Sequence, residues 1–145
     1  MTQTDDKLTE ALVDQLPDAI IFSDTDGIIR VWNAAAERIF GFSQSEAIGA
    51  TLDIIIPERF REGHWRGFDR ALADKQTKYI GHSLPTRSHR KDGTQIVVEL
   101  SFAILLSADE AIGALATARD ITERHEKERA DRKRLQELEA AQGSG

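Results

Sequence analysis

The sequence predicts an α+β fold built on a five-stranded antiparallel sheet, and two observations carry this prediction. Residues 94–106 alternate between apolar and polar side chains, which is typical of a strand with one buried face. Two β-hairpins are also expected, with glycine-containing turns at residues 24–27 and 90–93. We therefore expect two strands, then short helices that cover one face of the sheet, and then three more strands.

The first element is expected to be a short amphipathic helix that ends before Pro17, because the residue before a proline disfavours helical geometry. Its apolar face is formed by Leu8, Leu12, Val13 and Leu16. Residues 19–23 and 28–32 then form the arms of the first hairpin.

Capping residues mark the short helices that follow. Asn33 is expected to cap a helix over residues 34–40, which ends at Gly41. Ser43 and Glu46 have the spacing of a capping box and predict the start of another helix. A third helix is expected over residues 58–73, after Pro57.

The second half of the body is expected to be β structure. Residues 78–90 and 94–106 form a hairpin, and residues 112–120 form a third strand. This last strand is rich in alanine, at positions 114, 116 and 118, which could leave room for a flat ligand against the sheet.

A charged helix is expected at the C-terminal end. Residues 121–142 contain six acidic and six basic side chains, so the net charge of −6 belongs to residues 1–120. A heptad frame places Ile121, Leu135 and Leu138 on one seam, and both a solvated helix and a dimer seam fit this pattern. The predicted organisation is an N-terminal flanking helix (1–16), a compact body (17–120) and a C-terminal helix (121–142).

Composition excludes several classes of function. The chain has no cysteine, which removes disulfides, thiolate metal sites and cysteinyl cofactor adducts. Its acidic charge argues against binding to nucleic acid or to an anionic membrane. No apolar run approaches the 18 or so residues of a membrane span, and the first residues do not form a signal peptide, so we expect a cytoplasmic location. Metalloprotease, P-loop and nucleophile-elbow motifs are missing, and we expect no enzymatic activity in the chain itself.

Six short motifs in a fixed order give the sequence a resemblance to a known family. They are Leu16-Pro17-Asp18-Ala19-Ile20, Asp26-Gly27-Ile28-Ile29, Trp32-Asn33-Ala34-Ala35-Ala36-Glu37, Phe40-Gly41-Phe42-Ser43, Arg90-Lys91-Asp92-Gly93 and Arg119-Asp120-Ile121-Thr122-Glu123-Arg124. In order and spacing, from about residue 12 to residue 124, they resemble the motifs of the PAS sensor family. The resemblance implies a PAS fold, with a last helix that passes a signal to an output domain outside this chain.

Within that family, residues 57–93 are similar to the haem-binding PAS domain of the FixL-type oxygen-sensing kinases of two-component systems. The similarity implies haem b as cofactor, with His64 as the ligand of the haem iron and Arg70 near a propionate. It also implies that Leu100 and Phe102 line the gas side of the haem. Leu84 stands where those sensors carry an arginine that hydrogen-bonds oxygen, so oxygen cannot be held here by that arginine.

Spacing independently makes His64 a candidate ligand. Phe60, His64, Phe68 and Leu72 recur every four residues, which predicts an apolar helix face toward the sheet. The sheet would supply Ile80, Leu100, Phe102 and Ile104, and His82 could face the same space and donate a hydrogen bond to a gas. An ordinary core histidine, bonded to a carbonyl group or to water, fits the same pattern.

Two functions follow from these observations. In the first, the chain is a sensor of a diatomic gas or of redox state that works through haem at His64. In the second, it is a PAS dimerisation and relay module without haem, whose cavity is empty or holds a small metabolite. Both include a homodimer formed by the flanking helices, through Leu8, Leu12 and Leu16 and through Ile121, Leu135 and Leu138, and both include a kinase-like output domain.

Overall fold

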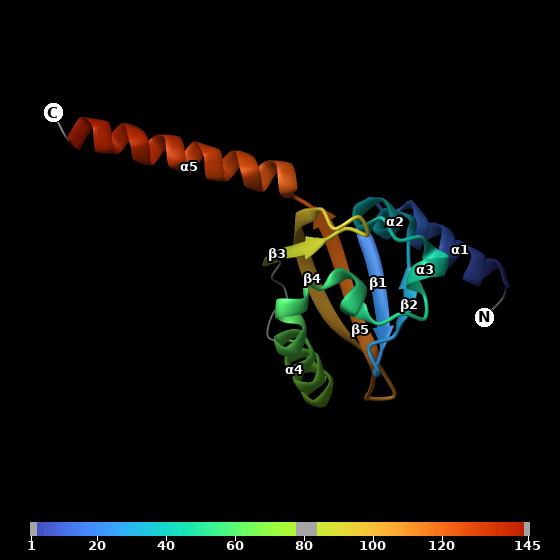
Figure 1. Cartoon of the computed structure of the whole chain (residues 1–145). Coiled ribbons are helices and arrows are strands. Elements are labelled where there is room, and N and C mark those ends of the chain that lie inside the picture. Colours follow the sequence, from blue (N-terminus) through green and yellow to red (C-terminus); the bar gives the residue numbers. More distant parts are fainter. Residues whose placement is uncertain (1–2, 78–83, 144–145) are drawn as a thin grey trace.

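The computed structural model describes residues 3–77 and 84–143, and these residues form a five-stranded antiparallel sheet with helices packed beside it (Figure 1). The strand order is β2-β1-β5-β4-β3, so the first and last strands of the chain, β1 and β5, pair at the centre. The elements are α1 (Gln3–Gln15), β1 (Ala19–Asp24), β2 (Ile29–Trp32), α2 (Ala34–Phe40), α3 (Gln44–Ala47), the 3₁₀ helix η1 (Leu52–Ile55), α4 (Glu58–Asp74), β3 (Leu84–His89), β4 (Gln95–Ser107), β5 (Glu110–Asp120) and α5 (Thr122–Gly143). The expected α+β fold and its order of elements are confirmed.

The inner face of the sheet places large side chains of β4 opposite alanines of β5. Phe102 pairs with Ala116, and Ile104 pairs with Ala114. One row further toward the core, Leu100 pairs with Ala118, which is 1% exposed. The alternation predicted for residues 94–106 is therefore present, and its apolar positions share a face with the small residues of the neighbouring strand.

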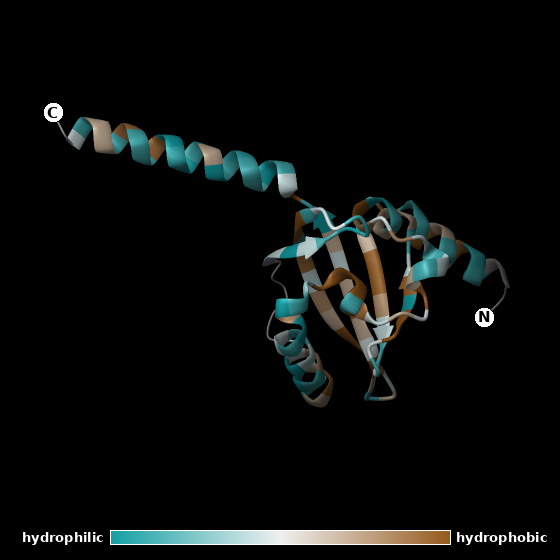
Figure 2. Ribbon diagram, in the orientation of Figure 1, coloured by the Kyte–Doolittle hydropathy of each residue, from teal (hydrophilic) through white to brown (hydrophobic). Residues whose placement is uncertain are grey.

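The core lies between this inner face and helices α2 and α3. Trp32, Phe40 and Val98 are fully buried. The rings of Trp32 and Phe40 lie 5.6 Å apart, and the indole Nε1 of Trp32 donates a hydrogen bond of 2.9 Å to the carbonyl oxygen of Phe42. Figure 2 shows hydrophobic stretches on β1 and β2 and a mostly hydrophilic α5, so the apolar burial is confined to the body.

Asn33 joins three elements around this core. Its Oδ1 accepts hydrogen bonds from the backbone N–H groups of Ala36 at 3.0 Å and Ile20 at 2.9 Å, so it caps α2 and also holds β1. Its Nδ2 donates to the carbonyl oxygens of Val13 at 2.8 Å and Asp18 at 3.0 Å. The predicted cap is confirmed, and the same side chain also ties the end of α1 to the sheet.

Helix α4 faces the sheet with His64 and Phe68, as expected, but not with Phe60. Phe68 is buried, as predicted, but Phe60 is 43% exposed and lies under the guanidinium group of Arg59, 4.7 Å from the ring centre. The prediction that Phe60 faces the sheet was therefore wrong. Phe60 lies in the first turn of the helix, directly after Pro57 at the N-cap.

The two flanking helices expose their leucines. Leu8, Leu12 and Leu16 at the N-terminal end are 57%, 60% and 42% exposed, and Leu135 and Leu138 of α5 are 57% and 54% exposed. Ile121, by contrast, is only 5% exposed, because it packs on the body at the base of α5. Its assignment to the exposed seam was therefore wrong. Within the described ranges, no helix combines the length and apolar character needed to cross a bilayer.

Replacing Asn33 by alanine is expected to lower the free energy of unfolding by about 3 kcal/mol, since it removes a helix cap and leaves buried backbone groups unpaired. Urea denaturation followed by circular dichroism measures this change. Gln44→Ala is the control, because the exposed Gln44 amide makes one 3.2 Å bond to the carbonyl oxygen of Trp32. A loss from Asn33→Ala no larger than that from the control would contradict the role given to Asn33.

Candidate functional site

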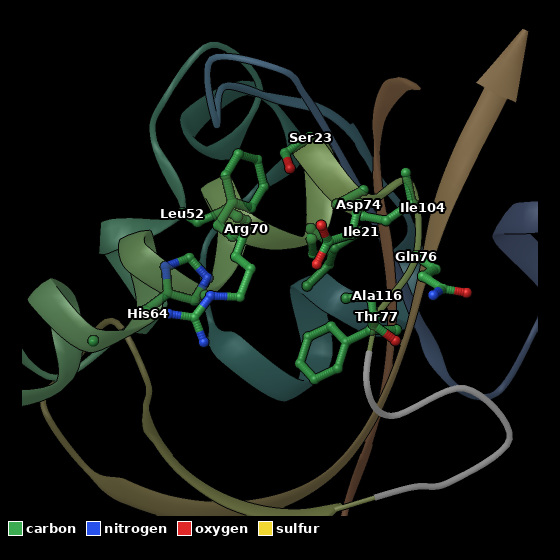
Figure 3. Close-up of a pocket in the computed structure, with 16 residues that line it drawn as sticks. Ile21, Ser23, Leu52, His64, Arg70, Asp74, Gln76, Thr77, Ile104 and Ala116 are labelled. Carbon is green, nitrogen blue, oxygen red and sulfur yellow. The ribbon is translucent and has the colours of Figure 1, made fainter. Parts of the chain in front are cut away.

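A cavity of about 350 Å³ lies between helix α4 and the inner face of the sheet (Figure 3). Its sheet wall is formed by Ile21, Ser23, Phe102, Ile104, Ala114 and Ala116. Its helix wall is formed by Gly63, His64, Gly67, Phe68, Arg70 and Ala71, and Leu52, Asp74, Gln76 and Thr77 complete the lining. This volume is in the range of protein sites for small molecules and cofactors.

Small residues on both walls create the space. On the sheet side these are Ala114 and Ala116, as the alanine-rich sequence suggested. On the helix side they are Gly63 and Gly67, where an added Cβ would meet no described atom within 4 Å. Glycine in a helix interior lowers stability by about 1 kcal/mol relative to alanine. The helix thus tolerates two unfavourable residues beside a space that the described side chains leave open.

Helix α4 is held over the cavity at two points. In its middle, the indole Nε1 of Trp65 donates a 2.8 Å hydrogen bond to the carboxylate of Asp53. The ring of Trp65 also lies against Gly27, where an added Cβ would come within 2.3 Å of it. At its end, Lys75 Nζ donates a 2.5 Å bond to the carbonyl oxygen of Asp109 in the β4–β5 turn. Between and beside these attachments, His64 and Phe68 face the cavity.

His64 carries the strongest chemical signal in this site. The ring is half-buried, and its centre lies 4.7 Å from that of Trp65 and 6.0 Å from that of Phe68. Its Nδ1 atom is buried and has no hydrogen-bond partner among the described residues. Burial lowers the pKa of His64 below its usual 6.5, and the nearby negative charge of Asp53 acts in the opposite direction. The neutral imidazole is therefore favoured at pH 7, with one ring nitrogen free to bind a ligand.

The structure brings three of the predicted site residues together and separates others. His64, Arg70 and Phe102 all line the cavity, and the guanidinium-bearing Arg70 is exposed at its rim. Leu100 is not among the described lining residues but packs against the core cluster, whereas Ile104, also expected at this wall, lines the cavity. The backbone of Leu84 pairs with Leu100. Ile80 and His82 lie outside the described residues.

Sequence reasoning did not identify Ser23 or the contacts of Trp65 and Asp53. On β1, Ser23 alternates in step with Ala19 and Ile21, so its side chain lies on the same inner face of the sheet. The alternation alone could therefore have revealed a polar residue on that face. No local signal announces the bond between Trp65 and Asp53, because it joins residues twelve positions apart on different elements.

The lowered pKa of His64 predicts a pH-dependent stability. His64 binds a proton at its usual pKa of about 6.5 in the unfolded chain, but only at lower pH in the folded chain. The contribution of the neutral His64 to the free energy of unfolding is therefore fully present above about pH 6.5 and is lost as the pH falls below that value. Urea denaturation between pH 5 and 8 should show that the wild type loses stability toward acid relative to His64→Gln, which cannot titrate. A difference between the two proteins that stays constant, or that grows toward acid in favour of the wild type, would contradict this prediction.

Comparisons with known proteins agree with this architecture. A family model described as the PAS fold matches residues 13–126. The sensor protein FixL of Bradyrhizobium diazoefficiens is 35% identical over 130 residues, which cover 90% of this chain and 25% of FixL. The oxygen sensor protein DosP of Escherichia coli is 27% identical over 110 residues, covering 76% of this chain and 14% of DosP.

Solved structures give the same result. The PAS domain of a protein from Colwellia psychrerythraea is 25% identical with a TM-score of 0.69, and the match covers 81% of this chain and 97% of that one. An RNA-binding Light-Oxygen-Voltage receptor is 18% identical with a TM-score of 0.71, over all of this chain and 41% of that one, and shares the fold. The chain spans a quarter or less of the length of the two sensors named above. It belongs to the PAS family of sensory domains.

Proposed function

We propose that this PAS domain senses a diatomic gas or redox state through haem held by His64. The observation that carries the proposal is the buried Nδ1 atom of His64, which lacks a partner among the described residues and belongs to a ring that lines an apolar cavity. Histidine is a common protein ligand of haem iron. The similarity to FixL and DosP, which are named as a sensor and an oxygen sensor, supports the proposal.

The described residues fit haem b in three respects. The neutral imidazole of His64 would bind the iron, and Phe102 with Ile104 would supply an apolar wall. Arg70, exposed at the rim, would pair with a propionate group. When bound, the haem would supply an iron coordination position for a diatomic gas. Ile80, His82 and Leu84 remain predicted contacts of the cofactor.

The signal is proposed to leave the domain through α5. In this proposal residues 17–120 form the sensor, residues 1–16 a flanking helix, and residues 121–142 the connection to a kinase-like output domain, in which any catalysis would lie. Ile121 donates its backbone N–H to the carbonyl oxygen of Val97 at 2.9 Å, and Thr122 Oγ1 accepts from the N–H of Val97 at 2.9 Å. These bonds fix the base of α5 to β4, so a change in the sheet can alter its direction.

The haem proposal predicts a visible spectrum that depends on His64. Protein titrated with haem should give a Soret band that saturates at one haem per chain and shifts when carbon monoxide is added to the reduced form. His64→Ala should lose most of this band, because the iron then has no protein ligand. His125→Ala is the control, since His125 lies on α5, away from the cavity, and it should keep the wild-type spectrum. A colourless wild type, or an unchanged His64→Ala spectrum, would refute the proposal.

A second candidate is the relay module without haem, in which the cavity is empty or holds a small metabolite. The observation that favours it is Asp74, which lines the cavity on the same helix as Arg70 and gives the lining both signs of charge. A carboxylate there is unfavourable for the propionates of haem and suits a small polar ligand better. The absorption spectrum described above separates the two candidates.

The exposed leucines predict a homodimer formed by the flanking helices in either case. Multi-angle light scattering should give twice the chain mass, and the double substitution Leu8→Glu and Leu12→Glu should shift the protein toward monomer, since it places charges in the apolar contact. Leu106→Glu is the control, because Leu106 is 48% exposed on β4, outside the flanking helices. A wild type that stays monomeric at high concentration would rule out this dimer.

A further inference from the structure

Two buried polar side-chain atoms of the described residues have no hydrogen-bond partner, and both belong to residues that line the same cavity. One is Nδ1 of His64 on α4, discussed above. The other is the hydroxyl oxygen of Ser23 on β1. Buried polar groups in native proteins are nearly always paired, so two exceptions at one cavity indicate a ligand that pairs with them.

Ser23 is the more deeply buried of the two residues. It is 1% exposed and lies on the inner face of the sheet, paired with Ala114 of β5 and Ile29 of β2. Neither of these neighbours has a polar side chain. Figure 3 shows the Ser23 side chain at the cavity, on the strand that also carries Ile21.

Another buried serine on the same sheet shows how the fold normally satisfies such a group. Ser88 of β3 is 5% exposed, and its hydroxyl donates a 2.5 Å hydrogen bond to the carbonyl oxygen of Ile55. Ser23 has the same chemistry and greater burial, yet no such bond is present among the described residues. The difference between the two serines is that Ser23 borders the cavity and Ser88 does not.

The walls around Ser23 define the kind of molecule that would fit. Of the six described residues by which the strands line the cavity, Ser23 alone has a polar side chain; the others, Ile21, Phe102, Ile104, Ala114 and Ala116, are apolar. A ligand at this wall therefore needs an apolar body, because polar atoms placed elsewhere against the strands would lose their hydrogen bonds to water. It also needs one hydrogen-bonding atom at the position of Ser23.

We infer that the Ser23 hydroxyl is a ligand-binding group of this cavity, and that it selects a ligand with an apolar body and one hydroxyl or carbonyl oxygen directed at β1. The inference rests on the proposed use of the cavity as a ligand site, but it does not depend on haem. It adds a polar contact from the sheet to the one that His64 offers from the helix.

Phenol and toluene test this inference, because they have nearly the same shape and differ in one hydroxyl group. Their dissociation constants are measured by titration of the ¹⁵N-labelled protein, with the backbone resonances of the cavity residues as the readout. The ratio of toluene to phenol dissociation constants should fall by about two- to tenfold in Ser23→Ala, the effect of one lost hydrogen bond. Ser88→Ala is the matched control and should leave this ratio unchanged.

An unchanged ratio in Ser23→Ala, or an equal fall in Ser88→Ala, would overturn the inference. So would the failure of both probes to shift any cavity resonance of the wild type. If Ser23→Ala does not fold, Ser23→Cys serves instead, since its thiol keeps the shape of the side chain and hydrogen-bonds weakly. The haem proposal fails separately, through the absorption spectrum, so each hypothesis can be lost without the other.

Discussion

The hydrogen bonds of Asn33 are the interaction on which the rest of the structure depends. One buried amide group contacts the end of α1, the start of β1 and the first turn of α2, using two acceptor bonds and two donor bonds. Asn33 directly follows Trp32, the last residue of β2, so the buried indole ring and the helix cap are adjacent in the sequence. These four bonds therefore hold the end of α1, the start of β1 and the first turn of α2 together.

The domain combines this well-satisfied region with a poorly filled one. Around Trp32 and Phe40 the side chains are fully buried and the polar groups are paired. Around α4 the helix contains two glycines, and two buried polar atoms are unpaired. Regions with fewer buried contacts open at lower free energy than the core does. The part of the fold best suited to respond to a ligand is therefore the part whose own packing stabilises it least.

Local rules were sufficient to predict most of the fold but less of the site. The cap at Asn33, the left-handed residue Gly41 and the capping box of Ser43 with Glu46 depend on neighbours within a few positions, and the structure has all of them. The exposure of Phe60, and the packing of Leu100 in the core rather than at the cavity, depend on where α4 crosses the sheet. That crossing is set by long-range contacts of Trp65, with Asp53 and Gly27, and no spacing in the sequence reports them.

The direct passage from β5 into α5 has a mechanical consequence. Strand β5 passes the cavity at Ala114 and Ala116, and only Ile121, anchored on the body, separates its end from the first residue of α5. A helix of 22 residues is about 33 Å long, and Figure 1 shows it extending away from the body. A tilt of about 5° at its base would displace the far end by about 3 Å over such a length. In the proposed relay, α5 would act as a lever arm that converts a small adjustment of one strand into a displacement of about 3 Å at its far end.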